Sequence, residues 1–415
     1  MEETCQKLNK NLLLYCTKFI YLALIAIPFV ASFSSALVNI FIGFAIFAYF
    51  IKKIAKREFL PIKTVINIPF LFIIIISFIS FFNSIDLKSS MGGIGKLIKY
   101  GFLFVIFAEE LIDRQHLKKI IIALILGLTL VSLDGIYQLY VGKDLFRNRA
   151  YNYVIGLPRL NATFPHTNIF AAYLGLMLPI NISLTLYYLK GKIKLLLGTI
   201  SILALSCLVF TFSRGAIIGF LTSLVFMAIV KRDKLVLLLL IFVLLVTPFL
   251  LPKNIRNWIK TTDSVWEVLL NKERINIYKT SLNMIRAHPL IGVGVNTFCS
   301  NYQKYKIKET SGFTWDARYY AHNNFLHMSG EIGLFGLAVF LWLLFAFFRR
   351  WVIFFRNIGS NFLKICSLGV VAGIIAFLIN GLTETTLYNS KVATLFWYQI
   401  GLFLGLSKLD KGVKE

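Results

Sequence analysis

Charged residues are scarce in this chain, and cysteines are few. Only 15% of the 415 residues are Asp, Glu, Lys or Arg, whereas a soluble domain carries about 25%. The five cysteines form no CxxC pair, and all but Cys299 lie in or beside apolar runs, which argues against a disulfide framework or a cysteine zinc site. Soluble enzymes, disordered regulators and secreted disulfide scaffolds are therefore poor candidates.

Long apolar runs dominate what is present. Hydrophobic residues make up 58% of the chain, and residues 64–82 (TVINIPFLFIIIISFISFF) can cross a hydrocarbon core of about 30 Å as one helix. We therefore expect an all-α polytopic membrane protein with about twelve transmembrane helices and a retained, uncleaved first helix. The predicted spans are 12–32, 35–51, 64–82, 94–111, 118–141, 168–189, 193–212, 214–230, 234–251, 326–348, 362–381 and 392–407.

Basic residues gather in alternate connections, which predicts that both termini are cytoplasmic. These connections lie near residues 52–63, 114–119, 190–194, 231–234 and 349–356. Two connections on the opposite side are long, 142–167 and 252–325. We accordingly divide the chain into residues 1–251, a large external loop at 252–325, and residues 326–415.

The large external loop is basic, with 11 Lys and Arg against 5 Asp and Glu. Its apolar spacing at Ile275, Tyr278, Leu282 and Ile285 predicts an amphipathic helix that ends before Pro289. A basic surface near the lipid headgroups suits an anionic substrate, or serves only to attract anionic lipid. Because the excess of 25 positive charges is distributed around membrane spans, we do not expect nucleic acid as a partner.

Arg214 lies in FTFSRGAIIGF, at the outer junction of two apolar spans. An arginine at mid-membrane costs about 2.5–3.5 kcal/mol on insertion scales, and less near the interface. It is therefore a functional candidate, the alternative being an interfacial side chain that reaches toward the headgroups. Ser213 is a candidate cap for the helix that follows.

The stretch HNNFLHMSGEIGLFG (322–336) opens the tenth predicted span. Asn323 or Asn324 is expected to cap that helix, which would place His322 beside its positive end. His327 and Glu331 are four residues apart, share one helix face and are expected to hydrogen-bond to each other. His322 and His327 face different ways and form no HExxH pattern, so we expect no metal site.

A third polar stretch, residues 156–168, leads into the sixth predicted span, with Thr167 or Asn168 as the expected helix cap. Its Arg159 and His166 could contact a phosphate or a sugar, or the stretch could be an ordinary polar loop.

Four segments together resemble the O-antigen ligase family of the wider O-antigen ligase and polymerase superfamily. They are RLNATFPHTNIFAAYLGLMLPI (159–180), FTFSRGAIIG (210–219), ERINIYKTSLNMIRAHPLIGVGVNTF (273–298) and HNNFLHMSGEIGLFG (322–336). Helices one to five match only as hydrophobic spans.

The resemblance implies a metal-independent, cofactor-free glycosyltransferase in the bacterial inner membrane, with its active site facing the periplasm. Such enzymes move a glycan from undecaprenyl pyrophosphate onto a sugar of lipid A–core, within lipopolysaccharide biosynthesis. Carried over by motif, the essential arginines fall on Arg214 and Arg274 and the essential histidine on His322, with His327 as the alternative imidazole. Similar motifs also occur in polymerases and in protein-glycosylating members, so the acceptor stays open.

These assignments make chemical sense. Guanidinium groups can bind pyrophosphate oxygens bidentately, and a neutral imidazole can take the proton of an acceptor hydroxyl. As further substrate-binding residues we predict Arg159, His166, Arg286, His327 and Tyr320. A polymerase of the same superfamily and a transporter or flippase are the alternatives. The gathering of unusual groups on one outer face argues against transport.

Overall fold

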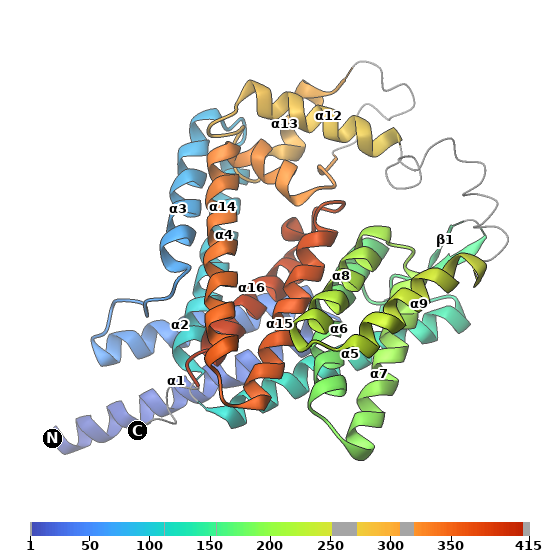
Figure 1. Cartoon of the computed structure of the whole chain (residues 1–415). Coiled ribbons are helices and arrows are strands. Elements are labelled where there is room, and N and C mark those ends of the chain that lie inside the picture. Colours follow the sequence, from blue (N-terminus) through green and yellow to red (C-terminus); the bar gives the residue numbers. More distant parts are fainter. Residues whose placement is uncertain (1, 112, 155, 251–271, 308–318, 410–415) are drawn as a thin grey trace.

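The computed structural model describes residues 2–111, 113–154, 156–250, 272–307 and 319–409, and it is almost entirely helical (Figure 1). Two short strands, β1 (Asn152–Val154) and β2 (Leu157–Arg159), form an antiparallel hairpin in which Asn152 pairs with Arg159. Two 3-10 turns are η1 (Ser80–Asn83) and η2 (Thr386–Tyr388). The helices are α1 (Glu2–Val30), α2 (Ser35–Lys56), α3 (Asn67–Ile79), α4 (Leu87–Glu110), α5 (Arg114–Val141), α6 (Thr167–Tyr187), α7 (Gly191–Phe210), α8 (Arg214–Lys231), α9 (Lys234–Leu250), α12 (Lys272–Ala287), α13 (Phe298–Tyr305), α14 (Asn324–Asn357), α15 (Asn361–Asn380) and α16 (Ser390–Leu406).

Every predicted span coincides with a helix, namely α1 to α9 and α14 to α16. In the part of the chain that the structure describes, nine helices are long and apolar enough to cross a membrane. Three of the predicted spans form helices that are shorter than these nine: α3 with 13 residues, and α9 and α16 with 17 residues each. The all-α membrane fold is confirmed, whereas the number of twelve crossings and the loop layout stay predictions.

Helices α6 and α15 form the centre of the membrane part, and most of their residues are buried. Glycines allow their backbones to touch: a Cβ added at Gly373 would lie 2.3 Å from the Leu176 carbonyl oxygen, and one at Gly369 would lie 2.8 Å from Ile180 Cα. Small residues permit this close helix packing in membranes. The contacts run antiparallel, so the start of α6 lies beside the end of α15.

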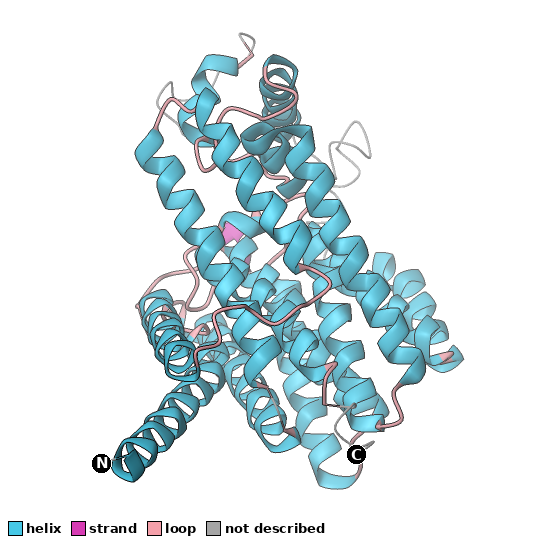
Figure 2. Ribbon diagram, turned by 90° about the vertical axis from the view of Figure 1, so that its left-hand side faces the viewer, coloured by secondary structure: helices cyan, strands magenta, loops and turns pink. Residues whose placement is uncertain are grey.

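An outer layer covers one end of the bundle, where α12 and α13 lie near the start of α14 (Figures 1 and 2). The layer has its own small core, consisting of Ile277, Met284, Val293, Phe298, Tyr302 and Ala321. Helix α12 confirms the helix predicted before Pro289. The predicted apolar face is only partly right: Ile285 is buried, but Leu282 is 42% exposed, and Ile277, Thr280, Ser281 and Met284 form the buried face. Residues 251–271 and 308–318, which belong to the same predicted loop, lie outside the described residues.

Helix α14 is broken at Gly333, where φ is +72°. The turn before α13 approaches so closely here that a Cβ on Gly333 would lie 2.0 Å from the Leu290 carbonyl oxygen. The glycine-rich segment 292–296 therefore packs against α14. On the other side of this segment, Gly294 lies against Ser84, with 2.8 Å between an added Cβ and Ser84 Cβ.

Candidate functional site

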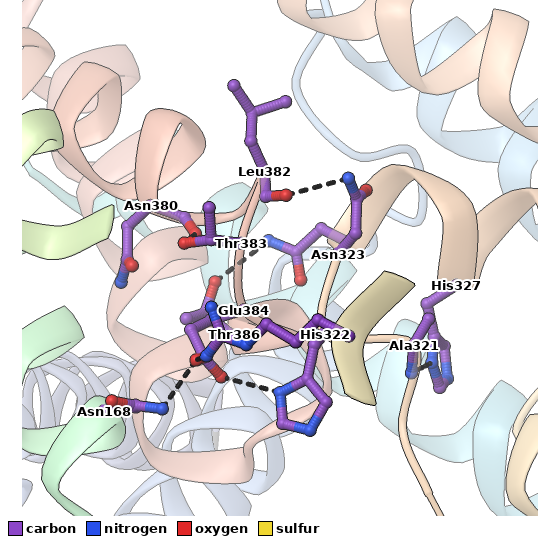
Figure 3. A network of polar contacts seen from close by, with 12 residues as sticks. Asn168, Ala321, His322, Asn323, His327, Asn380, Leu382, Thr383, Glu384 and Thr386 are labelled. Carbon is purple, nitrogen blue, oxygen red and sulfur yellow. Dashed lines mark hydrogen bonds and ion pairs between the residues drawn. The ribbon is translucent and has the colours of Figure 1, made fainter. Parts of the chain in front are cut away.

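Glu384 is the centre of the polar network between the helix ends, and the sequence analysis did not single it out. It lies in the short connection between α15 and η2, with 10% of its side chain exposed. Its Oε1 accepts a hydrogen bond from Asn168 Nδ2 at 2.5 Å and forms an ion pair with the Arg274 guanidinium. Its Oε2 lies 3.1 Å from His322 Nδ1 (Figure 3). One carboxylate thus links α6, α12 and the segment before α14.

The segment that carries Glu384 is held by the start of α14. The Asn323 side chain caps α14 through the N–H groups of Phe325 and Leu326, and its Nδ2 donates to the Leu382 carbonyl oxygen at 2.9 Å (Figure 3). The buried Asn324 donates to Thr386 Oγ1 at 2.9 Å and accepts from Leu387 N at 3.0 Å. This doubly anchored connection fixes Glu384 opposite His322. The prediction that Asn323 or Asn324 caps the helix is confirmed.

Asn168 and Arg159 continue the network toward α7. Arg159 Nη2 donates to Asn168 Oδ1 at 2.8 Å, and Arg159 Nε donates to the Thr211 carbonyl oxygen at 2.9 Å. Burial lowers the pKa of Arg159, which the Glu384 charge opposes and the Arg274 charge reinforces. The cap predicted at Thr167 or Asn168 is wrong, because α6 begins at Thr167 after His166 and has no side-chain cap. The side-chain amide of Asn168 instead bridges Arg159 and Glu384.

Arg214 reaches the same place by way of a tight turn. Phe212 has a left-handed backbone with φ +51°, and Ser213 precedes the first residue of α8, which is Arg214. Ser213 occupies the predicted cap position but makes no side-chain cap hydrogen bond. A Cβ on Gly215 would lie only 1.9 Å from Thr383 Oγ1, so glycine is needed for this approach.

Three guanidinium groups therefore converge beside Glu384. Arg159, Arg214 and Arg274 line one small cavity of about 50 Å³ together with Thr383 and Glu384. The site has three formal positive charges and one negative charge, and this excess of positive charge attracts an anion such as a pyrophosphate.

His322 faces the same carboxylate from the opposite side. Its backbone is left-handed, with φ +47°, and its carbonyl oxygen accepts from Tyr278 Oη at 3.1 Å. Strained backbone of this kind is typical of functional sites. When Nδ1–H donates to ionised Glu384, the neutral ring keeps an unprotonated Nε2 that can accept a proton. A third of the side chain is exposed, so Nε2 is not sealed off.

A larger cavity of about 540 Å³ opens next to His322 and Glu384. Four predicted substrate or catalytic residues line it: Arg159, His166, Tyr320 and His322. Asn152 and Asn389 extend its polar lining. This volume is in the range of small-ligand sites, and it lies directly beside the cavity of the three arginines because Arg159, Asn168 and Glu384 line both.

Two predicted residues lie elsewhere. His327 is 1% exposed, with Nε2 at 3.2 Å from Glu331 Oε1 and Nδ1 accepting from Ala321 N at 3.3 Å. Its ring centroid lies 4.3 Å from that of Phe298. The predicted pairing with Glu331 is confirmed, and His327 lines neither cavity. Arg286 is exposed in the last turn of α12 and lines neither cavity.

Among the described residues, no cluster of three or more His, Cys, Asp or Glu side chains could hold a metal ion. The positively charged side chains that line the smaller cavity are those of Arg159, Arg214 and Arg274.

Residues 199–341 match the family model described as O-antigen ligase. Over this segment, about a third of the chain, the sequence is similar to the O-antigen ligase domain. The matched segment of this domain runs from α7 into α14 and contains Arg214, Arg274 and His322, so the resemblance predicted from sequence is confirmed. Arg159, Asn168 and Glu384 lie outside the matched segment and complete the site only in three dimensions. No curated protein matches the chain significantly.

Proposed function

We propose that this O-antigen ligase family protein transfers a glycan from undecaprenyl pyrophosphate to a sugar hydroxyl of lipid A–core. The observation that carries the proposal is the convergence of Arg159, Arg214 and Arg274 on Glu384, with His322 on the other side of the same carboxylate. This arrangement supplies both an anion site and a proton acceptor, as displacement from a pyrophosphate requires.

In the proposed reaction, the acceptor oxygen attacks the anomeric carbon of the first donor sugar. The bond between that carbon and the phosphate oxygen breaks, and its electron pair leaves with undecaprenyl pyrophosphate. The hydroxyl proton passes to Nε2 of His322, and the charge of Glu384 stabilises the imidazolium that forms. Arg159, Arg214 and Arg274 offset the charge that develops on the leaving group.

We further propose that the reaction needs no metal and no cofactor, since guanidinium groups provide the positive charge that a divalent ion provides elsewhere. The protein would act in the bacterial inner membrane with both termini in the cytoplasm. Residues 252–325 and the two cavities would then face the periplasm.

The direct test supplies purified protein with a defined undecaprenyl-pyrophosphate glycan and lipid A–core. Glycan attached to lipid A–core supports the proposal. Extension of the glycan on its own lipid carrier would instead identify a polymerase of the same superfamily. An Arg214→Gln variant is the matched negative control, because it removes one guanidinium and keeps a polar side chain.

A further inference from the structure

A second group of basic side chains lies outside the site described above. Arg147 and Arg149 belong to the connection after α5, and Lys391 is the second residue of α16. Arg147 is exposed and Arg149 is partly buried, whereas Lys391 is only 5% exposed. Hydrogen bonds place both arginines beside residues 162–164, where Lys391 lies over the Phe164 ring. Gln138 donates to the Arg149 carbonyl oxygen at 3.0 Å and accepts from Ala162 N at 2.9 Å. Arg147 Nη2 donates to the Phe33 carbonyl oxygen at 2.9 Å, next to Ser32, whose carbonyl oxygen accepts from Thr163. The three residues therefore form one basic cluster.

Lys391 has an unusual environment for a lysine. Its Nζ lies 4.6 Å from the centre of the Phe164 ring. Neither this nitrogen nor Nη1 of Arg149, both shielded from solvent, has a hydrogen-bond partner among the described residues. Buried cations are normally paired or hydrogen-bonded, because an unpaired buried charge is costly.

The surroundings balance the positive charge of the cluster only in part. Lys391 occupies the first turn of α16, where the helix dipole is also positive. Asp144 belongs to the same connection, and its carboxylate accepts from the N–H groups of Phe146, Arg147 and Arg149. These neutral donors leave its negative charge in place, so it offsets one of the three positive charges of the cluster. None of the ion pairs between described residues includes Arg147, Arg149 or Lys391.

We propose that Arg147, Arg149 and Lys391 form a second anion-binding site, and that its ligand is a phosphate group. Arginine forks and a lysine ammonium are the side chains that bind phosphate oxygens in proteins. The exposed Arg147 and partly buried Arg149 leave the cluster accessible from outside.

The cluster adjoins the larger cavity, and none of its three residues lines the smaller cavity of the three arginines. The Lys391 ammonium lies over the ring of Phe164. The next two residues along the chain, Pro165 and His166, line the larger cavity. Asn389, two residues before Lys391, also lines that cavity. A phosphate on a sugar acceptor could bind here while its hydroxyl approaches His322, a role that rests on the proposed function. A phospholipid headgroup offers the same chemistry.

The first experiment measures the thermal unfolding of detergent-purified protein as inorganic phosphate replaces chloride at constant ionic strength. A ligand that binds only the folded state raises the unfolding temperature. Phosphate should also bind beside Glu384, so wild type, Lys391→Met, Arg214→Gln and the double variant are compared. We expect each single variant to lose part of the phosphate-dependent rise and the double variant to lose the sum of both parts, as independent sites require.

Lys88→Met is the matched control, because this exposed lysine at the start of α4 lies outside the cluster; it should keep the full rise. In chloride alone, Lys391→Met should unfold no earlier than wild type, since it removes an unpaired buried charge. An unchanged phosphate response in Lys391→Met would overturn the proposal. If this variant does not fold, Arg147→Gln with Arg149→Gln provides the same readout from more exposed positions.

A second experiment identifies the source of the phosphate. Wild type and Lys391→Met are compared in phosphatidylcholine nanodiscs with added glucose 1-phosphate, and in nanodiscs that contain phosphatidylglycerol. A stabilisation that depends on Lys391 with the sugar phosphate supports the site as an acceptor subsite, and one with the anionic lipid supports it as a headgroup site. Absence of both overturns it. Because no glycan transfer is measured, these outcomes are independent of the proposed function.

Discussion

At the scale of single residues, Glu384 connects the proposed anion site with the proposed base. It accepts from Asn168, pairs with Arg274 and faces Nδ1 of His322. It therefore has two opposed effects: it orients and polarises the imidazole, and it cancels part of the positive charge that would hold a pyrophosphate. These effects can be separated by measuring turnover and donor binding independently.

Glu384→Gln is expected to lower kcat by about 10²–10⁴-fold, up to the full contribution of the general base that the carboxylate orients. Donor binding should stay equal or become tighter, because three guanidinium groups then lack their counter-charge. Turnover and donor affinity of the purified variant check this, with Glu384→Asp as the variant that keeps the charge. Weaker donor binding in parallel with the lost turnover would mean that Glu384 acts mainly by holding Arg274.

The two histidines of the 322–336 segment should respond differently to substitution. His322→Ala is expected to lower turnover by about 10²–10⁴-fold, the contribution of a general base, with donor binding retained. His327→Ala should chiefly destabilise the fold, by about 1.5–3 kcal/mol, because the buried Glu331 carboxylate then keeps only its hydrogen bond from Phe298 N. Turnover per folded molecule and thermal unfolding distinguish these effects. Near-normal turnover in folded His322→Ala would contradict the assignment of the base.

At the scale of elements, helix ends build the site. Four helix ends meet around Glu384: the starts of α6, α8 and α14 and the end of α15. Each of them contributes one or two polar side chains to the site. The closeness of these ends depends on glycine at contact points such as Gly215, which lies against Thr383.

Gly215→Ala is expected to push the start of α8 away from the 380–384 segment and so displace Arg214. Its Cβ would lie 1.9 Å from Thr383 Oγ1, so transfer should fall at least tenfold, which corresponds to about 1.4 kcal/mol of lost transition-state stabilisation. Adding Thr383→Ala removes the nearest clashing atom and should restore part of the activity. Gly198→Ala is the control, since an added Cβ there would lie 3.9 Å from Thr185 Cγ2, an ordinary contact distance. Normal activity in Gly215→Ala would show that the turn tolerates a larger separation.

At the scale of the whole molecule, helix α4 connects two chemically different ends. Near its start, Lys96 donates to Asn296 at 3.0 Å, beside the outer layer. At its end, Glu110 and Glu109 pair with Lys52 and Lys53 of α2. Those lysines belong to the connections predicted to be cytoplasmic, so the candidate site and the outer layer would lie on the other side of the membrane.

Labelling with a membrane-impermeant maleimide tests this orientation. In a Cys5→Ser, Cys299→Ser background, a cysteine at the exposed Lys304 of α13 should react in intact spheroplasts. A cysteine at the exposed Lys192 of α7 should react only after permeabilisation. The reverse pattern would place the site in the cytoplasm and contradict the proposed donor geometry.

Chelation tests the chemistry of the site as a whole. Because guanidinium groups surround the proposed phosphate position, glycan transfer by purified protein should survive excess EDTA. Loss of turnover that one added divalent metal restores would show that the arginines do not suffice. Arg214→Lys serves as the companion variant: it keeps the charge but loses the bidentate fork, so turnover should still fall strongly.

Patterns within short segments predicted a large part of this protein. Apolar runs marked the helices because any span must satisfy its backbone within itself, and the i, i+4 spacing predicted the His327–Glu331 pair. The resemblance pointed to Arg214, Arg274 and His322. By contrast, the place of Glu384 depends on contacts across 62 to 216 residues of chain, to His322, Arg274 and Asn168. Such pairings arise only when α6, α12, α14 and α15 pack together. Local sequence carries no signal for which helix ends meet, and therefore none for the carboxylate that joins the arginines to the histidine.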